Sequence, residues 1–313
     1  MTINPTRFNI PCNEDMRIYY IIPVILLALS CAPQERTECY VDVGRLNLPG
    51  DSWEPAAIAV AADGTVYVAD SSLNCAVQIF DAEGVYVGAI GSLGKGPGEL
   101  FVPTDVAVGP DGNIYVAEFG THRVSVFRTD GAFVKALGER DLTAPFGVAV
   151  GPDGKVYVAD AQAGGLLIFS PEGALLETWG KDRDTGQILD VAVAPDGSVA
   201  YAPGAEGDVL FFAAGRADPL RLKTGGNAAS APAEVAIGPR GDFFVLSQRT
   251  DAGGALENFV AKLSPQGKLL EEVPLSLTSP SAVAVAPDGT MYVADATRHD
   301  VRIYRPRQAD SPK

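Results

Sequence analysis

The sequence predicts an all-β fold made of six copies of one unit, and two observations support this. A short motif recurs along the chain: an apolar strand, usually opened by proline, then a tight turn ending in glycine, then a second apolar strand. Apolar residues on both sides of each turn alternate with a period of two, which is typical of strands. The turn glycines are 48, 42, 43, 44 and 48 residues apart, at Gly64, Gly112, Gly154, Gly197, Gly241 and Gly289. Periods of about 40 to 50 residues indicate a propeller, a solenoid or another repeat array.

The third copy shows how the first two strands of a unit arise. Val148 and Val150 share one face before the turn, and Val156 and Val158 share one face after it. The turn between them, residues 151–154, reads Gly-Pro-Asp-Gly. There proline fixes φ, aspartate bonds to nearby backbone and the last glycine adopts the left-handed conformation that closes a hairpin. We therefore expect two antiparallel strands, called a and b.

Two further strands, c and d, complete each unit. Strand d follows a second glycine turn, as in residues 131–138 (Gly-Ala-Phe-Val-Lys-Ala-Leu-Gly). Strand c ends in an aromatic residue in five of the copies, at Phe80, Phe127, Phe169, Phe212 and Tyr304. A unit of four antiparallel strands is the blade of a β-propeller, and such rings have about four to eight blades. We therefore predict a six-bladed β-propeller.

The sixth unit ends after strand c, so its fourth strand must come from elsewhere in the chain. Residues 39–44 precede the first blade and end like other fourth strands, for example residues 136–138. We expect this N-terminal strand to complete blade 6, because an open ring would leave unpaired strand edges. The predicted propeller spans residues 38–306 and is followed by a tail, 307–313.

The repeat resembles that of the NHL-repeat family. Blade 2 is the best match, with Pro-x-x-Val-Ala-Val-x-x-Asp-Gly-x-Ile-Tyr-Val-Ala over residues 103–117 and Thr-His-Arg-Val-x-Val-Phe over 121–127. The resemblance implies the propeller fold and says little about activity, because one fold hosts many functions. Blades 4 and 5 depart from the pattern, with Tyr-Ala-Pro-Gly at 201–204, Arg240 before the turn glycine, and extra residues between 247 and 259.

A leader precedes the repeats. Thirteen uncharged, mostly apolar residues (18–30) follow Arg17, too few to span a bilayer but suited to a secretory signal. Ser30-Cys31 resembles the lipobox of bacterial lipoproteins, in which the cysteine is diacylated and becomes the new N-terminus. An uncleaved or simply secreted leader is the alternative.

The leader sets the expected domain boundaries at the N-terminus. We expect translation to begin at Met16, because residues 1–15 are polar and unlike a signal, with a signal peptide at 16–30 and a tether at 31–37. Ala32, which stands where an aspartate would retain the protein at the inner membrane, implies by the lipoprotein resemblance an anchor in the bacterial outer membrane or cell surface.

Charge and cysteines limit the classes of partner. The formal charge is −15 and the chain has no basic run, which argues against nucleic acid. We expect a monomer that binds a protein, a small molecule or a glycan and contacts the membrane through its lipid. Cys39 and Cys75 should lie at opposite faces of the ring, so we do not expect them to pair, although export would permit a disulfide.

Carboxylates near the start of the inner strands form one candidate site. Strand a lines the central channel, where several carboxylates could hold a hard cation such as Ca²⁺. Lactonases of the gluconolactonase and paraoxonase type place a metal there. The candidate ligands are Asp105, Asp190, Glu234 and, just upstream in blade 1, Glu54. The other blades offer Ala57, Gly147 and Ala282, so the ring of carboxylates is incomplete and no cofactor is required.

A second candidate group lies five residues before the end of strand c, where the family carries histidine. This slot holds Cys75, His122, Gly164, Gly207, Asn258 and His299 in blades 1 to 6. Histidine and cysteine bind zinc, but neighbouring blades diverge at this distance from the axis. We expect these side chains, with Arg123, to lie in the loops of the binding face and to bond within those loops.

A third group comprises the acids that end strand b: Asp70, Glu118, Asp160 and Asp295. They can accept hydrogen bonds from loop amides or from nearby arginines, and this needs no ligand.

The enzyme classes find little support. No Gly-x-Ser-x-Gly elbow, phosphate loop or His-Glu-x-x-His motif occurs. Peptidyl-α-hydroxyglycine amidating lyase, an NHL-like enzyme, has zinc histidines directly after blade-opening prolines, but the chain has two histidines in all and carries Thr104, Phe146, Ala233 and Ser281 there. We interpret the chain as a binding or scaffolding module. A metal-dependent lactonase or amidating-lyase-like enzyme and an extracytoplasmic sensor are the alternatives.

The lipobox interpretation is testable. A Cys31→Ser variant should lose fatty-acid labelling and leave the membrane fraction, because the thiol that accepts the diacylglycerol is gone. Metabolic labelling with a clickable fatty acid, followed by fractionation, measures both. Labelling that persists in the variant would contradict the prediction.

Overall fold

The computed structural model describes residues 40–48, 53–163, 165–180, 188–203, 208–214, 220–223, 230–250 and 253–307. All of these lie in the second of two compact units, which begins at Glu38. The predicted leader, Cys31 and the tether lie outside the described residues and stay predictions. Within the described residues there is no helix that could span a membrane.

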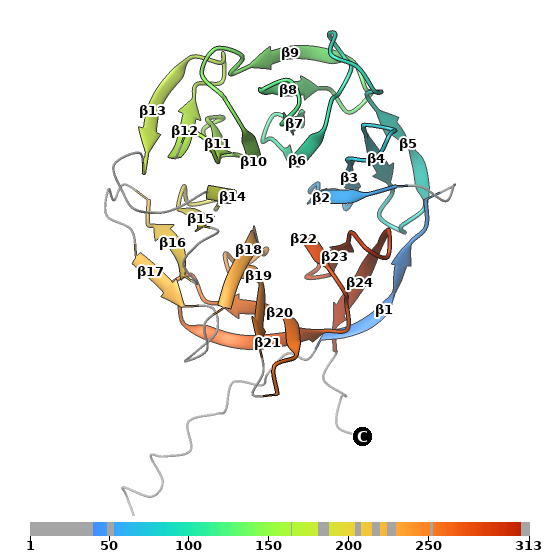
Figure 1. Ribbon diagram of the computed structural model, residues 1–313, viewed down its shortest axis with the longest axis vertical. Helices are drawn as coiled ribbons and strands as arrows, with labels where there is room; N and C mark the ends of the chain where they lie inside the picture. Colours follow the sequence, from blue (N-terminus) through green and yellow to red (C-terminus); the bar gives the residue numbers. More distant parts are fainter. Residues whose placement is uncertain are drawn as a thin grey trace, which may run out of the picture. The chain divides into compact units, whose positions relative to one another are not determined.

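Six four-stranded sheets surround a central channel, as predicted (Figure 1). Blades 1 to 3 are β2 (Pro55–Val60), β3 (Val66–Asp70), β4 (Ala76–Phe80), β5 (Tyr86–Ile90); β6 (Pro103–Val108), β7 (Ile114–Glu118), β8 (Arg123–Phe127), β9 (Phe133–Leu137); and β10 (Pro145–Val150), β11 (Val156–Asp160), β12 (Gly165–Phe169), β13 (Leu175–Trp179). Blades 4 to 6 are β14 (Ile188–Val193), β15 (Val199–Pro203), β16 (Asp208–Phe212), β17 (Leu220–Lys223); β18 (Ser230–Ile237), β19 (Phe243–Thr250), β20 (Leu256–Leu263), β21 (Leu269–Leu275); and β22 (Pro280–Val285), β23 (Met291–Asp295), β24 (Asp300–Pro306) with β1 (Tyr40–Leu46).

The N-terminal strand closes the ring, which confirms the prediction. β1 pairs antiparallel with β24, from Tyr40 opposite Pro306 to Leu46 opposite Val301 (Figure 1). The first and last described segments of the propeller therefore share one blade, and blade 6 has the same four strands as the others.

The core consists of six apolar clusters, each formed where two neighbouring blades face one another. Between blades 2 and 3, for example, Val124 and Val126 pack with Val148, Val158 and Phe169. Both faces of each sheet are buried in this way, which explains why strands b and c are apolar at almost every position.

Each inner strand carries a β-bulge near its start. In blade 2 the pairing of β6 with β7 shifts between Pro103 and Asp105, and the other five inner strands shift at the corresponding place. The residue between the two paired positions is left unpaired, and the next residue returns to the ladder. The bulge therefore sets which side chain of each inner strand is directed at the next blade.

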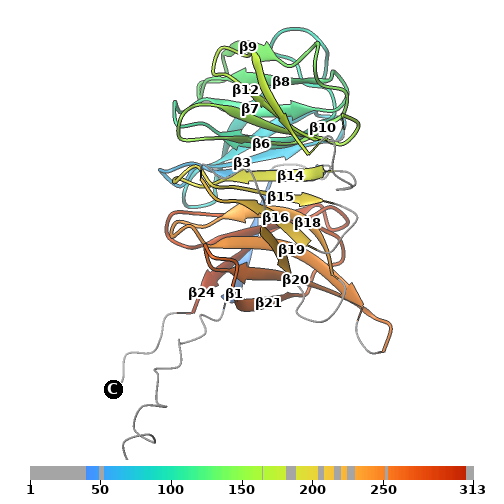
Figure 2. The same ribbon diagram turned by 90° about the vertical axis from the view of Figure 1, so that its left-hand side faces the viewer.

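Turns and loops gather at opposite faces of the ring. In the a–b turn of blade 2, Gly112 has a φ of 78° and its N–H donates to the carbonyl of Gly109 (2.9 Å). The a–b and c–d turns lie at one face, the turn face, and the b–c and d–a loops lie at the other, the loop face. In blade 5 the b–c connection is a long hairpin of two eight-residue strands, β19 and β20, that projects from the ring (Figure 2).

Ring closure by β1 should be measurable through one buried side chain. Leu46 is 2% exposed and packs in the cluster between blades 6 and 1, whereas Val43 on the same strand is 50% exposed. Leu46→Ala should lower the free energy of unfolding by about 2 to 4 kcal/mol. Val43→Ala, the control, should change it by less than about 0.5 kcal/mol. Urea unfolding measures both, and equal effects would contradict the role of β1.

Candidate functional site

One position on each inner strand, directly after the bulge, lies at the junction with the next blade. The six equivalent residues are Ala57, Asp105, Gly147, Asp190, Glu234 and Ala282. Blades 2, 4 and 5 therefore contribute carboxylates to these junctions, on the strands that line the channel. Three of the four acids predicted as metal ligands occupy these positions.

Asp105 joins blade 2 to blade 3. The amide N–H of Val148 on β10 donates to Oδ2 of Asp105 (2.6 Å), and the N–H of Val106 donates to Oδ1 (2.7 Å). The inner strand of every blade is a sheet edge, so some of its amides have no strand partner. Asp105 is 9% exposed and satisfies one of these edge amides from the neighbouring blade.

Asp190 and Glu234 repeat this arrangement in the next blades. The N–H of Val235 on β18 donates to Oδ2 of Asp190 (2.7 Å), and the N–H of Val283 on β22 bonds to Glu234. On its other side Asp190 packs against Gly147, where an added Cβ would lie 2.8 Å from the Asp190 Cα. This close approach requires glycine in blade 3. The carboxylates therefore link three of the six blade junctions.

Burial of the three carboxylates changes their acidity. Burial, with repulsion from Asp190, raises the pKa of Asp105 well above its usual value. Burial raises the pKa of Asp190 to about 7, and burial with repulsion from the two aspartates raises the pKa of Glu234 well above normal. The amide hydrogen bonds oppose these shifts. The group therefore retains protons near neutral pH and is a weaker ligand for a hard cation than three ionised carboxylates would be.

Glu54, the fourth predicted ligand, lies apart from the other three. It precedes β2, its side chain is exposed, and its N–H donates to Oδ1 of Asp70 (3.0 Å). Within the part of the chain that the structure describes, no group of three or more His, Cys, Asp or Glu side chains has a geometry suited to a metal ion.

The slot before strand c is distinguished by its backbone conformation in three of the blades. Cys75, His122 and His299 have φ values of 43°, 56° and 54°, in the left-handed region that favours glycine and asparagine. Gly164 and Gly207 hold this slot in blades 3 and 4 but lie outside the described residues. Asn258 lies within β20 and pairs with Gln248.

These slot residues bond mainly to loops. Cys75 is buried and free, and its Sγ donates to the carbonyl of Ser72 (3.3 Å). Nδ1 of His299 lies 2.9 Å from the carbonyl of Trp53, in the connection to the next blade. Nδ2 of Asn258 donates to the carbonyl of Leu277 (3.0 Å). The contacts of His299 and Asn258 hold neighbouring connections together, whereas the contact of Cys75 stays within its own loop.

The acids that end strand b tie loops to the blades, and Glu118 is the most extensively bonded. Its Oε1 accepts from Nε of Arg123 (2.9 Å), and its Oε2 accepts from the N–H of Phe101 (3.0 Å). Arg123, predicted for the binding face, is 6% exposed, and its guanidinium also donates to three carbonyls of the preceding connection. The other members, Asp70, Asp160 and Asp295, are likewise buried and accept from loop amides.

An exposed aromatic cluster lies on the loop face, and the sequence analysis predicted only His122 of its three members for this surface. The rings of Phe119 and Phe146 lie 5.6 Å apart, and that of His122 lies 6.3 Å from Phe119. Both phenylalanines are 36% exposed. Phe146 is the unpaired bulge residue of β10, where three other blades carry Ala56, Thr104 and Ser281. A large aromatic residue at a position where these blades have small residues was the feature of the sequence that could have indicated the cluster.

Comparison with known proteins supports the ring. A family model described as a 6-bladed beta-propeller matches residues 55–146. The chain is similar to a streptogramin B lyase (TM-score 0.61, 12% identity, 86% of this chain and 98% of that chain covered). It is also similar to virginiamycin B lyase from Staphylococcus aureus (0.61, 14%, 86% and 100%) and to Kuenenia stuttgartiensis hydrazine synthase (0.61, 18%, 84% and 98%). No curated protein matches the chain by sequence. At these identities the likeness shows the fold alone.

The raised pKa values predict how stability depends on pH. A carboxyl whose pKa rises on folding binds protons more tightly in the folded state, so its contribution is lost as pH rises toward the folded value. With its pKa at about 7, Asp190 alone should lower the free energy of unfolding by about 2 kcal/mol between pH 5.5 and pH 8.5, in addition to any share of Asp105 and Glu234. Asp190→Asn, which keeps an acceptor for Val235, should flatten this dependence, while the exposed-turn variant Asp288→Asn should not. Urea unfolding across this range tests it. Identical pH profiles for Asp190→Asn and the unchanged protein would contradict the prediction.

Proposed function

We propose that the chain is an exported, lipid-anchored propeller of the NHL type that acts as a binding or scaffolding module and recognises its ligand on the loop face. The exposed cluster of Phe119, Phe146 and His122 carries this proposal. Large aromatic side chains dominate the energy of many interfaces, and an exposed group of them on a polar surface marks a contact site.

The rigidity of the support favours a binding role. Phe119 follows Glu118, whose carboxylate is fixed by Arg123, and Phe146 adjoins Gly147 at the channel. Thr104 Oγ1 donates to the carbonyl of Pro145 (3.0 Å), so blade 2 also holds the start of β10. Two aromatic rings on fixed backbone lose little conformational entropy when a ligand binds.

The channel favours this reading over the enzyme alternative. A metal-dependent lactonase would need ionised carboxylate oxygens directed at the cation. Here Oδ2 of Asp105 and Oδ2 of Asp190 accept from edge amides of neighbouring blades, and Glu234 bonds to another. Turning these oxygens away from the amides and toward a metal would leave buried amides unsatisfied, which costs about 1 to 3 kcal/mol each.

Tyr40, the first described residue of the propeller, lies at the turn face. It is beside the a–b turns of blades 5 and 6, among Pro239, Arg240 and Gly289. The loop face, at the other end of the ring, is the surface that we propose for a protein, small-molecule or glycan ligand, whether for scaffolding or for sensing.

Site-specific cross-linking tests the loop face. A photoreactive phenylalanine at position 119, in cells that carry the anchored protein, should yield a discrete adduct, visible as a gel shift or a defined mass increase. The same group at position 288, on the turn face, is the control and should not yield that adduct. Adding Phe146→Ala should reduce the yield at least about fivefold, because the loss of a central aromatic contact costs about 1 kcal/mol or more. The same adduct from both positions, or a yield unchanged by Phe146→Ala, would contradict the proposal.

A further inference from the structure

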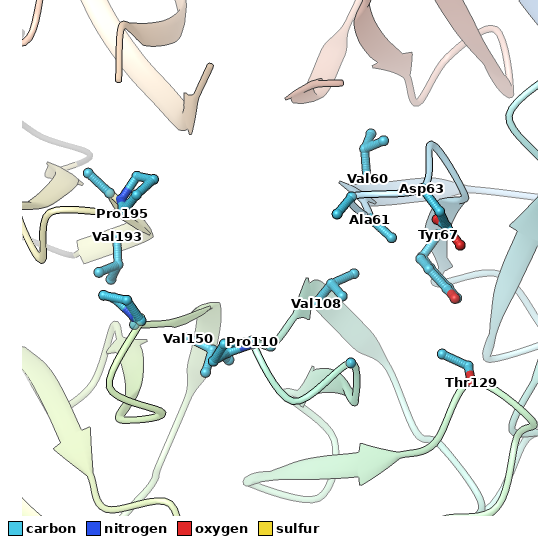
Figure 3. A pocket seen from close by; sticks show the side chains of 16 residues that line it. Val60, Ala61, Asp63, Tyr67, Val108, Pro110, Thr129, Val150, Val193 and Pro195 are labelled. Atoms are coloured by element: carbon cyan, nitrogen blue, oxygen red, sulfur yellow. The ribbon is translucent and has the colours of Figure 1, made fainter. Parts of the chain in front are cut away.

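A cavity of about 580 Å³ lies at the turn-face end of the channel (Figure 3). Blades 1 to 4 form its wall, and each contributes the valine that ends its inner strand. These are Val60, Val108, Val150 and Val193, which surround one opening in Figure 3. Ligand sites in proteins occupy about 300 to 1,000 Å³, so the cavity has the size of a small-molecule site.

The wall of this cavity is mostly apolar. Besides the four valines it includes Pro110, Pro152 and Pro195, which follow the ends of the inner strands. The valines are only partly buried by their own blades and face water in the cavity. An apolar body that fills the opening would remove this surface from water, with a gain of about 25 cal/mol per Å².

The lining of the cavity includes one carboxylate, and three more lie in the adjoining turns. Asp63 lines the cavity and is exposed, and its Oδ1 accepts from the N–H of Thr65 (3.0 Å). The hydrogen bonds from Thr65 lower the pKa of Asp63, so the carboxylate is ionised at neutral pH. The next three blades carry an exposed aspartate at the same place in their turns: Asp111, Asp153 and Asp196.

Few basic side chains lie near these carboxylates to neutralise their negative charge. Lys155 pairs with Asp153 (2.8 Å), but no lysine, arginine or histidine is among the described residues that line the cavity. With a formal charge of −15, the protein as a whole also attracts cations. The charge of the rim therefore complements a cationic group, while the wall complements an apolar one.

We propose that this cavity binds a cationic amphiphile, with an alkyl or similar apolar body among the four valines and its ammonium group at Asp63. The site lies at the opposite face from the aromatic cluster and does not depend on the ligand proposed there. An ammonium group at the rim keeps most of its hydration and gains the attraction of the turn carboxylates, whereas an anionic head group of the same length meets repulsion.

Calorimetric titration with a matched pair of probes tests the site. Decyltrimethylammonium and decanoate, both below their micelle concentrations, share an alkyl chain and differ in the sign of the head group. The cation should bind at least about threefold more tightly than the anion, and raised salt should narrow this difference. Equal affinity for the two probes, or no binding of the cation, would overturn the proposal.

Matched variants separate the two parts of the site. Asp63→Lys should weaken binding of the cation about threefold to tenfold and strengthen binding of decanoate. Asp288→Lys is its control, because Asp288 accepts from Thr290 N–H in the same way but lies outside this cavity. Val108→Phe, which fills the opening, should weaken both probes at least about tenfold, with circular dichroism to confirm the fold. Unchanged affinities in folded Asp63→Lys would overturn the proposal even if Val108→Phe proved unstable.

Discussion

The pairing of β1 with β24 is the contact on which the rest of the ring depends. A single four-stranded blade has two apolar faces and cannot bury either one by itself. Each of the six clusters therefore needs both of its blades, and the cluster between blades 6 and 1 exists only because the chain returns to its start. Leu46, supplied by β1, packs in that cluster, and Tyr40 contacts Phe244 in the cluster between blades 5 and 6. One strand of seven residues thus connects the core at two neighbouring junctions.

The sequence was sufficient to predict the repeat and the closure, because both depend on local patterns. Gly112 has the left-handed conformation that its turn requires. β1 pairs with β24, as expected from the resemblance of its last residues to the ends of other fourth strands. The bonds across blade junctions were not predictable in the same way. Asp105 and Val148 are 43 residues apart, and their contact depends on how one blade sits against the next. Phe119 and Phe146 meet for the same reason.

Blades 4 and 5, which depart from the repeat pattern in sequence, also lack the buried acid that ends strand b in the other blades. Opposite the start of the inner strand, where blade 2 has Glu118, blade 4 has Pro203 and blade 5 has Ser247. The Ser247 hydroxyl is buried and has no hydrogen-bond partner among the residues that the structure describes, whereas Glu118 accepts four hydrogen bonds. In blade 5 the long hairpin supplies other contacts, since Arg249 pairs with Glu257 (3.0 Å) and Glu272 (2.7 Å).

The channel carboxylates and the aromatic cluster are joined by one stretch of backbone. Phe146 is next to Gly147, and Gly147 lies so close to Asp190 that no side chain fits between them. Asp190 in turn accepts a hydrogen bond from β18. Because its pKa is about 7, the carboxyl group is partly protonated near physiological pH. Through these contacts Asp190 fixes the backbone beside Phe146 and also satisfies an edge amide of blade 5. One buried carboxylate thus supports both the blade junction and the backbone that presents the aromatic cluster.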